Sequence, residues 1–187
     1  MDEIQGWMGD EELDYLYQLV VDAPDDAVIV ELGAWRGRTT DRLYHAMHDE
    51  QSVCTVDTWL GQPDLRHTSH SDVLTVDIFL EFMENMQERN RFPLWWEPGL
   101  TGECYLRMLC DDAATLFTDG SVYAVIVDSD HRLVGHDVQV WSPKIAPGGI
   151  LCGHDFAWEG VKEQLEPLVT IKEVIGDLWI AEEGFPR

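Results

Sequence analysis

Short β-branched runs alternate with segments of helical periodicity, and this order restricts the fold more than any other feature of the sequence. The runs are apolar throughout, as in strands buried on both faces, whereas the segments between them space apolar residues three or four positions apart. The expected strands cover residues 27–32, 52–57, 104–109, 122–128 and 150–153. The expected helices cover residues 11–20, 38–48, 72–90, 112–117, 136–145 and 158–169.

This alternation predicts an α/β fold of the Rossmann-like, doubly wound kind, with a mainly parallel sheet between helical layers. An APGG turn is expected at 146–149, and residues 170–183 are predicted to form a closing hairpin. No repeat or linker divides the chain, so one domain is expected over 1–187. The longest helix should bury one face, formed by Val73, Val76, Phe79, Leu80, Met83 and Met86.

The charge balance excludes two classes of partner. The chain has 36 Asp and Glu against 12 Lys and Arg, a formal net charge of −24. Nucleic acid and anionic membrane surfaces would repel it, so neither is an expected partner. The acids are scattered, which favours a surface adapted to a salty cytoplasm over the alternative of a cationic partner. An acidic N-terminus and the lack of any apolar run of about 20 residues predict a soluble, cytoplasmic protein.

Two loops are candidates for contacts outside the core. The polar loop at 61–71 is a candidate lid, with an ordinary solvated loop as the equal alternative. Trp95 and Trp96 are candidates for a homo-oligomer interface, or else they cover the substrate pocket.

The stretch VIVELGAWRGRTT, at 28–40, carries the strongest functional signal. Gly33 and Gly37 are spaced G-x-x-x-G, whereas a dinucleotide site usually has G-x-G-x-x-G for its pyrophosphate. Glu31 stands at the entrance of the turn, where a phosphate would be repelled. An NAD(P)-type oxidoreductase is therefore the weaker alternative. A ligand without phosphate and with a positive charge fits better, and S-adenosylmethionine (SAM) is such a ligand.

Three further positions fit the parts of SAM. The N-terminus of the helix that begins near Thr39 would receive the carboxylate, because its free amides favour an anion. Asp57 ends the next strand and would bind both ribose hydroxyls. Asp111 or Asp112, after the following strand, would bind the adenine amino group.

With these residues in view, the motifs at 28–40, VDTW at 56–59, VIVDSDH at 125–131 and APGGILCGHDF at 146–156 resemble the class I SAM-dependent methyltransferases. The macrocin-type sugar O-methyltransferases are the most similar branch. The resemblance implies a seven-stranded sheet whose last strand is antiparallel. The cofactor site that it and the motif positions indicate comprises Glu31, Gly33, Ala34, Gly37, Thr39, Thr40, Asp57, Trp59, Asp111, Asp112 and Asp128.

Two departures from the family pattern stand out. Asp112 replaces a common Ser, and Leu133 replaces a common aromatic residue. The first leaves open which acid contacts adenine, and the second leaves open the substrate edge of the pocket.

The expected reaction is O-methylation of a small molecule such as a sugar or glycoside. Asp128 and Asp155 follow neighbouring strands and could share one Mg²⁺, as at the same strand ends in some related O-methyltransferases. In the equal, metal-free alternative, His131 is the preferred general base and His154 the next. The candidate catalytic residues are thus His131, His154 and Asp155. A non-catalytic SAM-binding module is the further alternative, favoured if Trp35 or Trp59 filled the pocket.

Overall fold

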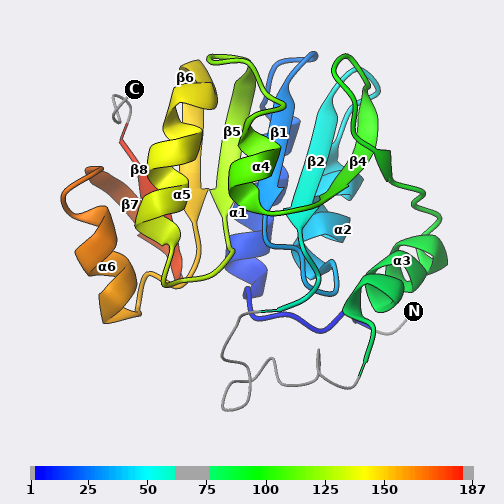
Figure 1. The fold of residues 1–187 in the computed structure, drawn as a ribbon, viewed down its shortest axis with the longest axis horizontal. Coiled ribbons are helices and arrows are strands. Elements are labelled where there is room, and N and C mark those ends of the chain that lie inside the picture. The colour runs from blue at the N-terminus through cyan, green and yellow to red at the C-terminus, as the bar shows by residue number, and fades with distance from the viewer. Residues whose placement is uncertain (1–2, 62–75, 183–187) are drawn as a thin grey trace.

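The computed structural model describes residues 3–61 and 76–182, which form an eight-stranded sheet with helices on both sides (Figure 1). The strand order is β3-β4-β2-β1-β5-β6-β8-β7. The strands are β1 (Val28–Leu32), β2 (Ser52–Asp57), β3 (Leu94–Trp95), β4 (Gly102–Arg107), β5 (Val122–Val127), β6 (Ile145–Gly153), β7 (Ile171–Ile175) and β8 (Leu178–Ala181). Only the pairings of β8 with β6 and β7 are antiparallel. The predicted Rossmann-like fold and closing hairpin are confirmed.

Helices cover both faces of the sheet, and each layer has its own core. They are α1 (Asp10–Val21), α2 (Arg38–Ala46), α3 (Ile78–Glu88), α4 (Cys110–Ala114), α5 (Val134–Trp141), the 3-10 helix η3 (Ser142–Lys144) and α6 (Glu159–Leu165). Ile29 packs with the layer of α1, α2 and α3, while Val30 packs with the layer of α4, α5 and α6. This alternation along β1 explains why the strand runs are apolar on both faces.

The helix predicted at 72–90 begins later than expected. Within the described residues it starts at Ile78, because the Asp77 side chain accepts a hydrogen bond from the amide of Leu80 at 3.1 Å and caps the helix. The predicted buried face is correct only in part. The fully buried positions are Ile78, Phe82 and Met86, four residues apart, whereas Val76 and Leu80 are exposed. Val73 lies outside the described residues, as does most of the loop at 61–71.

Two further details differ from the sequence-based expectation. The APGG segment is not a turn between elements but part of β6, where the pairing with β5 jumps from Val122–Ile145 to Ala124–Ile150. The extra residues therefore form a bulge rather than ending the strand. The resemblance implies seven strands, whereas the sheet has eight. The additional strand is the edge strand β3, and its two residues are too few to form a recognisable sequence pattern.

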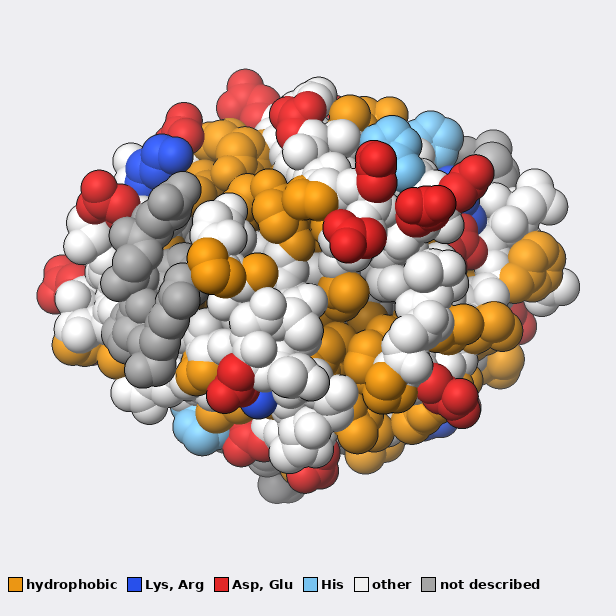
Figure 2. All heavy atoms as spheres, turned by 90° about the horizontal axis from the view of Figure 1, so that it is seen from above, with side chains coloured by type: hydrophobic (Ala, Val, Ile, Leu, Met, Phe, Trp, Pro, Cys, Tyr) orange, Lys and Arg blue, Asp and Glu red, His pale blue; other side chains and the backbone are white. Residues whose placement is uncertain are grey.

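The surface agrees with the charge pattern. Figure 2 looks onto the upper edge of the sheet of Figure 1, and acidic side chains lie all around this face with few Lys or Arg among them. No helix in the described parts of the chain combines the length and apolarity that crossing a bilayer requires.

Candidate functional site

Four strand ends meet at the lower edge of the sheet in Figure 1. The register pairs Leu32 with both Val56 and Val127, and Val127 with Gly153. The residues that follow these positions therefore lie next to one another. They are Gly33, Asp57, Asp128 and His154, all of them predicted site residues.

Gly33 allows the first turn to close against the end of β5. Its φ is +91°, and a Cβ there would lie 2.1 Å from the carbonyl oxygen of Asp128. The Asp128 amide donates to Leu32 at 2.8 Å and joins these two segments, and the Gly33 amide donates to Val56 of β2, also at 2.8 Å. A side chain at position 33 would separate these segments, so the glycine is a requirement of the backbone.

Asp57 organises the same turn. Its Oδ2 accepts hydrogen bonds from the amides of Ala34 (2.9 Å) and Trp35 (3.0 Å), and its Oδ1 accepts one from the amide of Trp59 (2.7 Å). A carboxylate offers about four acceptor positions, so these bonds leave room for a further donor. The ribose contact assigned to Asp57 stays a prediction.

Trp59 forms a wall beside this turn. Its side chain is buried, its indole N–H donates to the Trp35 carbonyl at 2.8 Å, and its ring packs against Phe79 and Phe82. Gly37, with φ +91°, is the N-cap of α2, and a Cβ there would lie 2.6 Å from the Met86 side chain.

Glu31 lies beneath the turn rather than at its entrance. The residue is fully buried, and its Oε2 accepts hydrogen bonds from the hydroxyls of Thr40 (2.6 Å) and Thr55 (2.7 Å). Its Oε1 has no hydrogen-bond partner among the described residues. Burial raises the pKa of Glu31 to about 8, although both hydroxyls act to lower it. Burial therefore favours the neutral form of Glu31. The residue does not lie at the entrance of the turn, and its expected repulsion of a phosphate stays a prediction.

The two threonines of α2 also point into the protein. Thr40 is fully buried on Glu31, and the hydroxyl of Thr39 contacts the sulfur of Met8 at 3.4 Å. They support the turn in this structure, and their direct contact with a cofactor stays a prediction.

The predicted adenine-site acids both lie in the first turn of α4 and are exposed. Asp111 is bound by Nε2 of His136, at 2.8 and 2.9 Å, and this interaction raises the pKa of His136. The carboxylate of Asp112 has no hydrogen-bond partner in the part of the chain that the structure describes. Asp112 is thus the freer of the two acids.

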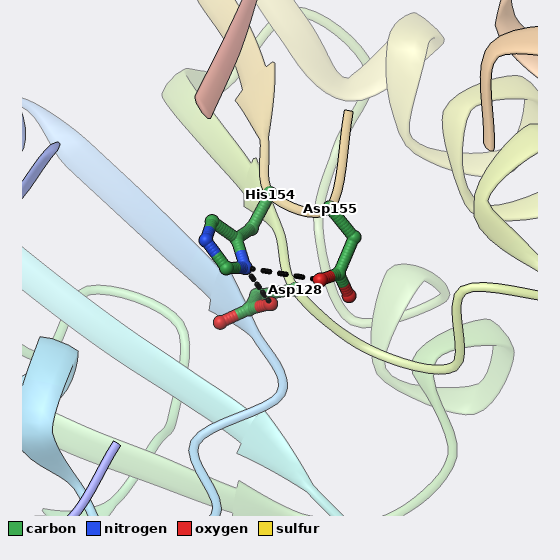
Figure 3. A group of neighbouring side chains, drawn as sticks. All are labelled: Asp128, His154 and Asp155. Carbon is green, nitrogen blue, oxygen red and sulfur yellow. Dashed lines mark ion pairs between the residues drawn. The ribbon is translucent and has the colours of Figure 1, made fainter. Parts of the chain in front are cut away.

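Asp128, His154 and Asp155 form a compact group at the ends of β5 and β6 (Figure 3). Nδ1 of His154 lies 3.6 Å from Oδ1 of Asp128 and 3.4 Å from Oδ1 of Asp155. The chain turns sharply at Asp155 (φ +61°), and both carboxylates face the same ring nitrogen. The three donor atoms lie within 4.8 Å of one another, a spacing that suits ligands of one metal ion.

This group has unusual electrostatics. Burial acts to lower the pKa of His154, but the carboxylates of Asp128 and Asp155 outweigh it and raise the pKa to about 11. Burial raises the pKa of Asp128, and His154 opposes that shift. The two carboxylates thus favour the protonated form of His154 when no other cation is present. The alternative of His154 as a general base stays a prediction.

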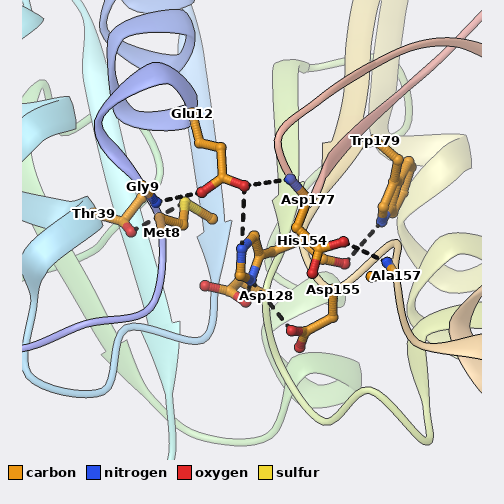
Figure 4. A network of polar contacts seen from close by, with 10 residues as sticks. All are labelled: Met8, Gly9, Glu12, Thr39, Asp128, His154, Asp155, Ala157, Asp177 and Trp179. Carbon is orange, nitrogen blue, oxygen red and sulfur yellow. Dashed lines mark hydrogen bonds and ion pairs between the residues drawn. The ribbon is translucent and has the colours of Figure 1, made fainter.

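Glu12 completes the group and was not foreseen from the sequence. It lies in α1, is 5% exposed, and its Oε1 lies 3.6 Å from Nε2 of His154 (Figure 4). Oε1 also accepts a hydrogen bond from the amide of Asp177, and Oε2 accepts one from Gly9. The sequence Gly-Asp-Glu-Glu at 9–12 could have indicated a helix cap, but no local sequence pattern predicts the contact of Glu12 with His154.

A small hollow, with room for about one water molecule, lies beside the group and includes the preferred base. His131 lies in its wall, and the ring of His131 packs on that of Trp158 with 4.3 Å between centroids. The lining residues are Val127, Asp128, Ser129, Asp130, His131, Val134, His154, Asp155 and Val161. All three predicted catalytic residues thus face one cavity.

Comparison with known proteins agrees with this geometry. Residues 30–156 match the model of a family described as methyltransferase domain. A search of curated protein sequences finds no match.

Solved structures share the fold at low identity. A protein from Corynebacterium glutamicum has a TM-score of 0.68 and 10% identity, over 97% of this chain and 84% of its own. The O-methyltransferase from Bacillus cereus, in complex with SAH, has a TM-score of 0.62 and 12% identity, over 94% and 83%. The O-methyltransferase TomG from Streptomyces achromogenes, in complex with SAM and involved in tomaymycin synthesis, has a TM-score of 0.64 and 14% identity, over 94% and 81%. At these identities the likeness establishes the fold alone.

Proposed function

This chain belongs to the methyltransferase-domain family, and we propose that it transfers the methyl group of SAM to an oxygen atom of a small-molecule acceptor, such as a sugar or glycoside. The observation that carries the proposal is the juxtaposition at one sheet edge of the Gly33 turn, Asp57 and the pocket that contains His131. The O-methyltransferases with SAM or SAH bound that share the fold support it.

The residues around the turn suit the chemistry of SAM. Oε1 of Glu31 is buried and has no partner among the described residues, so the ammonium group of SAM would pair with it and favour the ionised carboxylate. Asp57 retains acceptor capacity for a ribose hydroxyl, and Asp112 for the adenine amino group. When bound, SAM supplies the methyl group that is transferred.

The pocket would orient the acceptor and remove its proton. In-line displacement requires the acceptor oxygen to face the methyl group, and the pocket wall beside Asp128 would hold it there. His131 would accept the hydroxyl proton as the new carbon–oxygen bond forms and the carbon–sulfur bond breaks. Trp158 packs on the His131 ring and would restrict its rotation.

Asp128 and Asp155 would hold a divalent cation such as Mg²⁺. The carboxylate oxygens are the hard donors that this ion prefers. The two carboxylates lie close together, so negative charge is concentrated between them. Such an ion would lower the pKa of an acceptor hydroxyl. The choice of Mg²⁺ and the choice of a sugar-like acceptor are separate parts of the proposal, and each has its own test.

Calorimetric titration with S-adenosylhomocysteine and with NAD tests the function. We expect micromolar or tighter binding of the first and none of the second, followed by transfer of a labelled methyl group from SAM to a panel of hydroxylated acceptors. Binding of NAD without S-adenosylhomocysteine would overturn the proposal in favour of a nucleotide-dependent oxidoreductase. Binding of S-adenosylhomocysteine without transfer to any acceptor would favour a non-catalytic module.

A further inference from the structure

The segment that carries His131 lies between β5 and α5, and α6 packs beside it (Figure 1). Two contacts from α6 reach His131 itself. The ring of Trp158, at the N-cap of α6, packs on the His131 ring with 4.3 Å between centroids. Nε2 of Gln164, within α6, donates a hydrogen bond to the backbone carbonyl of His131 at 3.0 Å. One helix therefore contacts both the side chain and the backbone of the proposed base.

The amide group of Gln164 is fully used in this arrangement. Its Nε2 also donates to the carbonyl of Gly160 at 2.7 Å, one turn earlier in the same helix, and its Oε1 accepts a hydrogen bond from the amide of Gly135 at 3.2 Å. A side-chain amide has two N–H donors and one carbonyl oxygen, so each of its groups has a partner. The bond to Gly160 limits rotation of the side chain, and the other two bonds hold the chain on either side of the start of α5 at Val134.

The position of α6 is fixed by the core. Val161 and Leu165 are each 1% exposed and pack with the layer of α4, α5 and α6. Gly135 allows α5 to come close at this point, because a Cβ there would lie 3.1 Å from the Cβ of Gln164. The hydrogen bond from Gln164 therefore ties the His131 carbonyl to a helix that is anchored in the core.

We propose that Gln164 is a positioning residue for His131, which fixes the backbone of the base while Trp158 fixes its ring. The inference rests on the proposed function, in which His131 accepts the proton of the acceptor hydroxyl. A general base must lie within hydrogen-bond reach of that proton, and a misplacement of about 1 Å can cost on the order of 100-fold in rate. Gln164 bonds to the backbone of His131, so it acts through the base and takes no part in the proton transfer.

The test measures methyl transfer from SAM by the whole chain, with a panel acceptor that the natural chain methylates. Gln164→Leu keeps a side chain of similar volume but removes all three hydrogen bonds. Gln164→Glu retains an oxygen for the Gly135 amide but has no donor for the His131 carbonyl. Both variants should lower kcat about 10-fold to 100-fold and leave the KM for SAM and the affinity for S-adenosylhomocysteine unchanged. If Gln164→Leu does not fold, Gln164→Glu decides.

A double-mutant cycle separates positioning from a structural role. If Gln164 acts through His131, Gln164→Leu should have no further effect on kcat in the His131→Ala background. An equal loss of kcat in both backgrounds would show a structural role and would overturn the positioning role. Glu163→Gln, at the exposed neighbouring position of the same helix, is the matched control and should retain full kcat.

The NMR signals of the His131 ring protons provide a readout that needs no acceptor. The Trp158 ring lies 4.3 Å from the His131 ring and should displace these signals from the positions of an exposed histidine. They are identified by their absence from the spectrum of His131→Ala. Gln164→Leu and Gln164→Glu should move them toward the exposed positions, and unchanged signals in both variants would overturn the inference.

Failure of the proposed function has a different signature. Full turnover in His131→Ala would contradict the proposed base and the positioning role together. Loss of turnover in His131→Ala, with full turnover in both Gln164 variants, would overturn the positioning role alone. In that case binding of S-adenosylhomocysteine and methyl transfer by the natural chain would leave the proposed function standing.

Discussion

The carboxylate of Asp57, at the end of β2, accepts a hydrogen bond of 3.0 Å from the backbone amide of Trp35, in the turn after β1. The same oxygen binds the amide of Ala34 at 2.9 Å. Asp57 therefore shapes the turn before any ligand arrives, and a substitution there should affect both the protein and its ligand.

We expect Asp57→Asn to lower the melting temperature and to weaken the binding of S-adenosylhomocysteine by about tenfold or more. The amide nitrogen of Asn cannot accept hydrogen bonds from the backbone amides of the turn, and each lost bond to a charged group costs about 1.5–3 kcal/mol. Thermal unfolding and calorimetry measure the two effects. Asp26→Asn, at an exposed acid, is the control. Unchanged affinity in Asp57→Asn would contradict the cofactor site.

Gly33→Ala should destabilise the fold by about 3 kcal/mol or more, because the new Cβ would clash with the backbone of Asp128 and because φ at this position is unfavourable for alanine. Gly148→Ala separates the two causes, since Gly148 has a similar φ of +77° but no atom within 4 Å of the added Cβ. The control should lose only about 1–2 kcal/mol. Urea denaturation measures both, and equal losses would show that the clash is relieved by local movement.

Glu31 should make the protein less stable as the pH rises. Its pKa is about 8 in the folded protein against an ordinary 4.5, so between these values the folded state keeps a proton that the unfolded chain releases. The free energy of unfolding should fall by up to about 1.4 kcal/mol per pH unit in this window from this group alone. Glu31→Gln should flatten the curve between pH 4.5 and 8. Parallel pH profiles for the two proteins would contradict the raised pKa.

His131→Ala should reduce turnover about 100-fold to 10,000-fold while leaving the affinity for S-adenosylhomocysteine unchanged. The physical reason is the loss of the proton acceptor in the pocket, while the hydrogen bonds of Asp57 to the cofactor turn do not involve His131. His48→Ala, at an exposed histidine, is the control and should retain full activity. An EDTA-treated sample distinguishes the proposed metal ion from the proposed base. Full activity in EDTA would contradict the metal ion and would leave His131 as the general base.

Local patterns predicted most of the elements, and the errors lie where tertiary contacts decide. The strands could be located because burial on both faces demands continuous apolar runs. The start of α3 at Ile78 could not be predicted. Apolar residues before Asp77 continue the helical spacing in the sequence, but the Asp77 cap places the first helical residue at Ile78. The bulge in β6 has the composition of a turn, and only pairing with β5 makes it part of a strand.

The sequence by itself determined the fold class and the sheet edge at which the site lies, because the carboxyl ends of parallel strands must meet. It also determined that Gly33, Asp57, Asp128, His154 and Asp155 would gather there. What each side chain does at that edge was decided by the tertiary structure. Burial raises the pKa of Glu31, two aspartates raise the pKa of His154, and α1 brings Glu12 to the far side of its ring. These outcomes depend on solvent exclusion and on contacts between residues distant in the chain, and neither is encoded in local spacing.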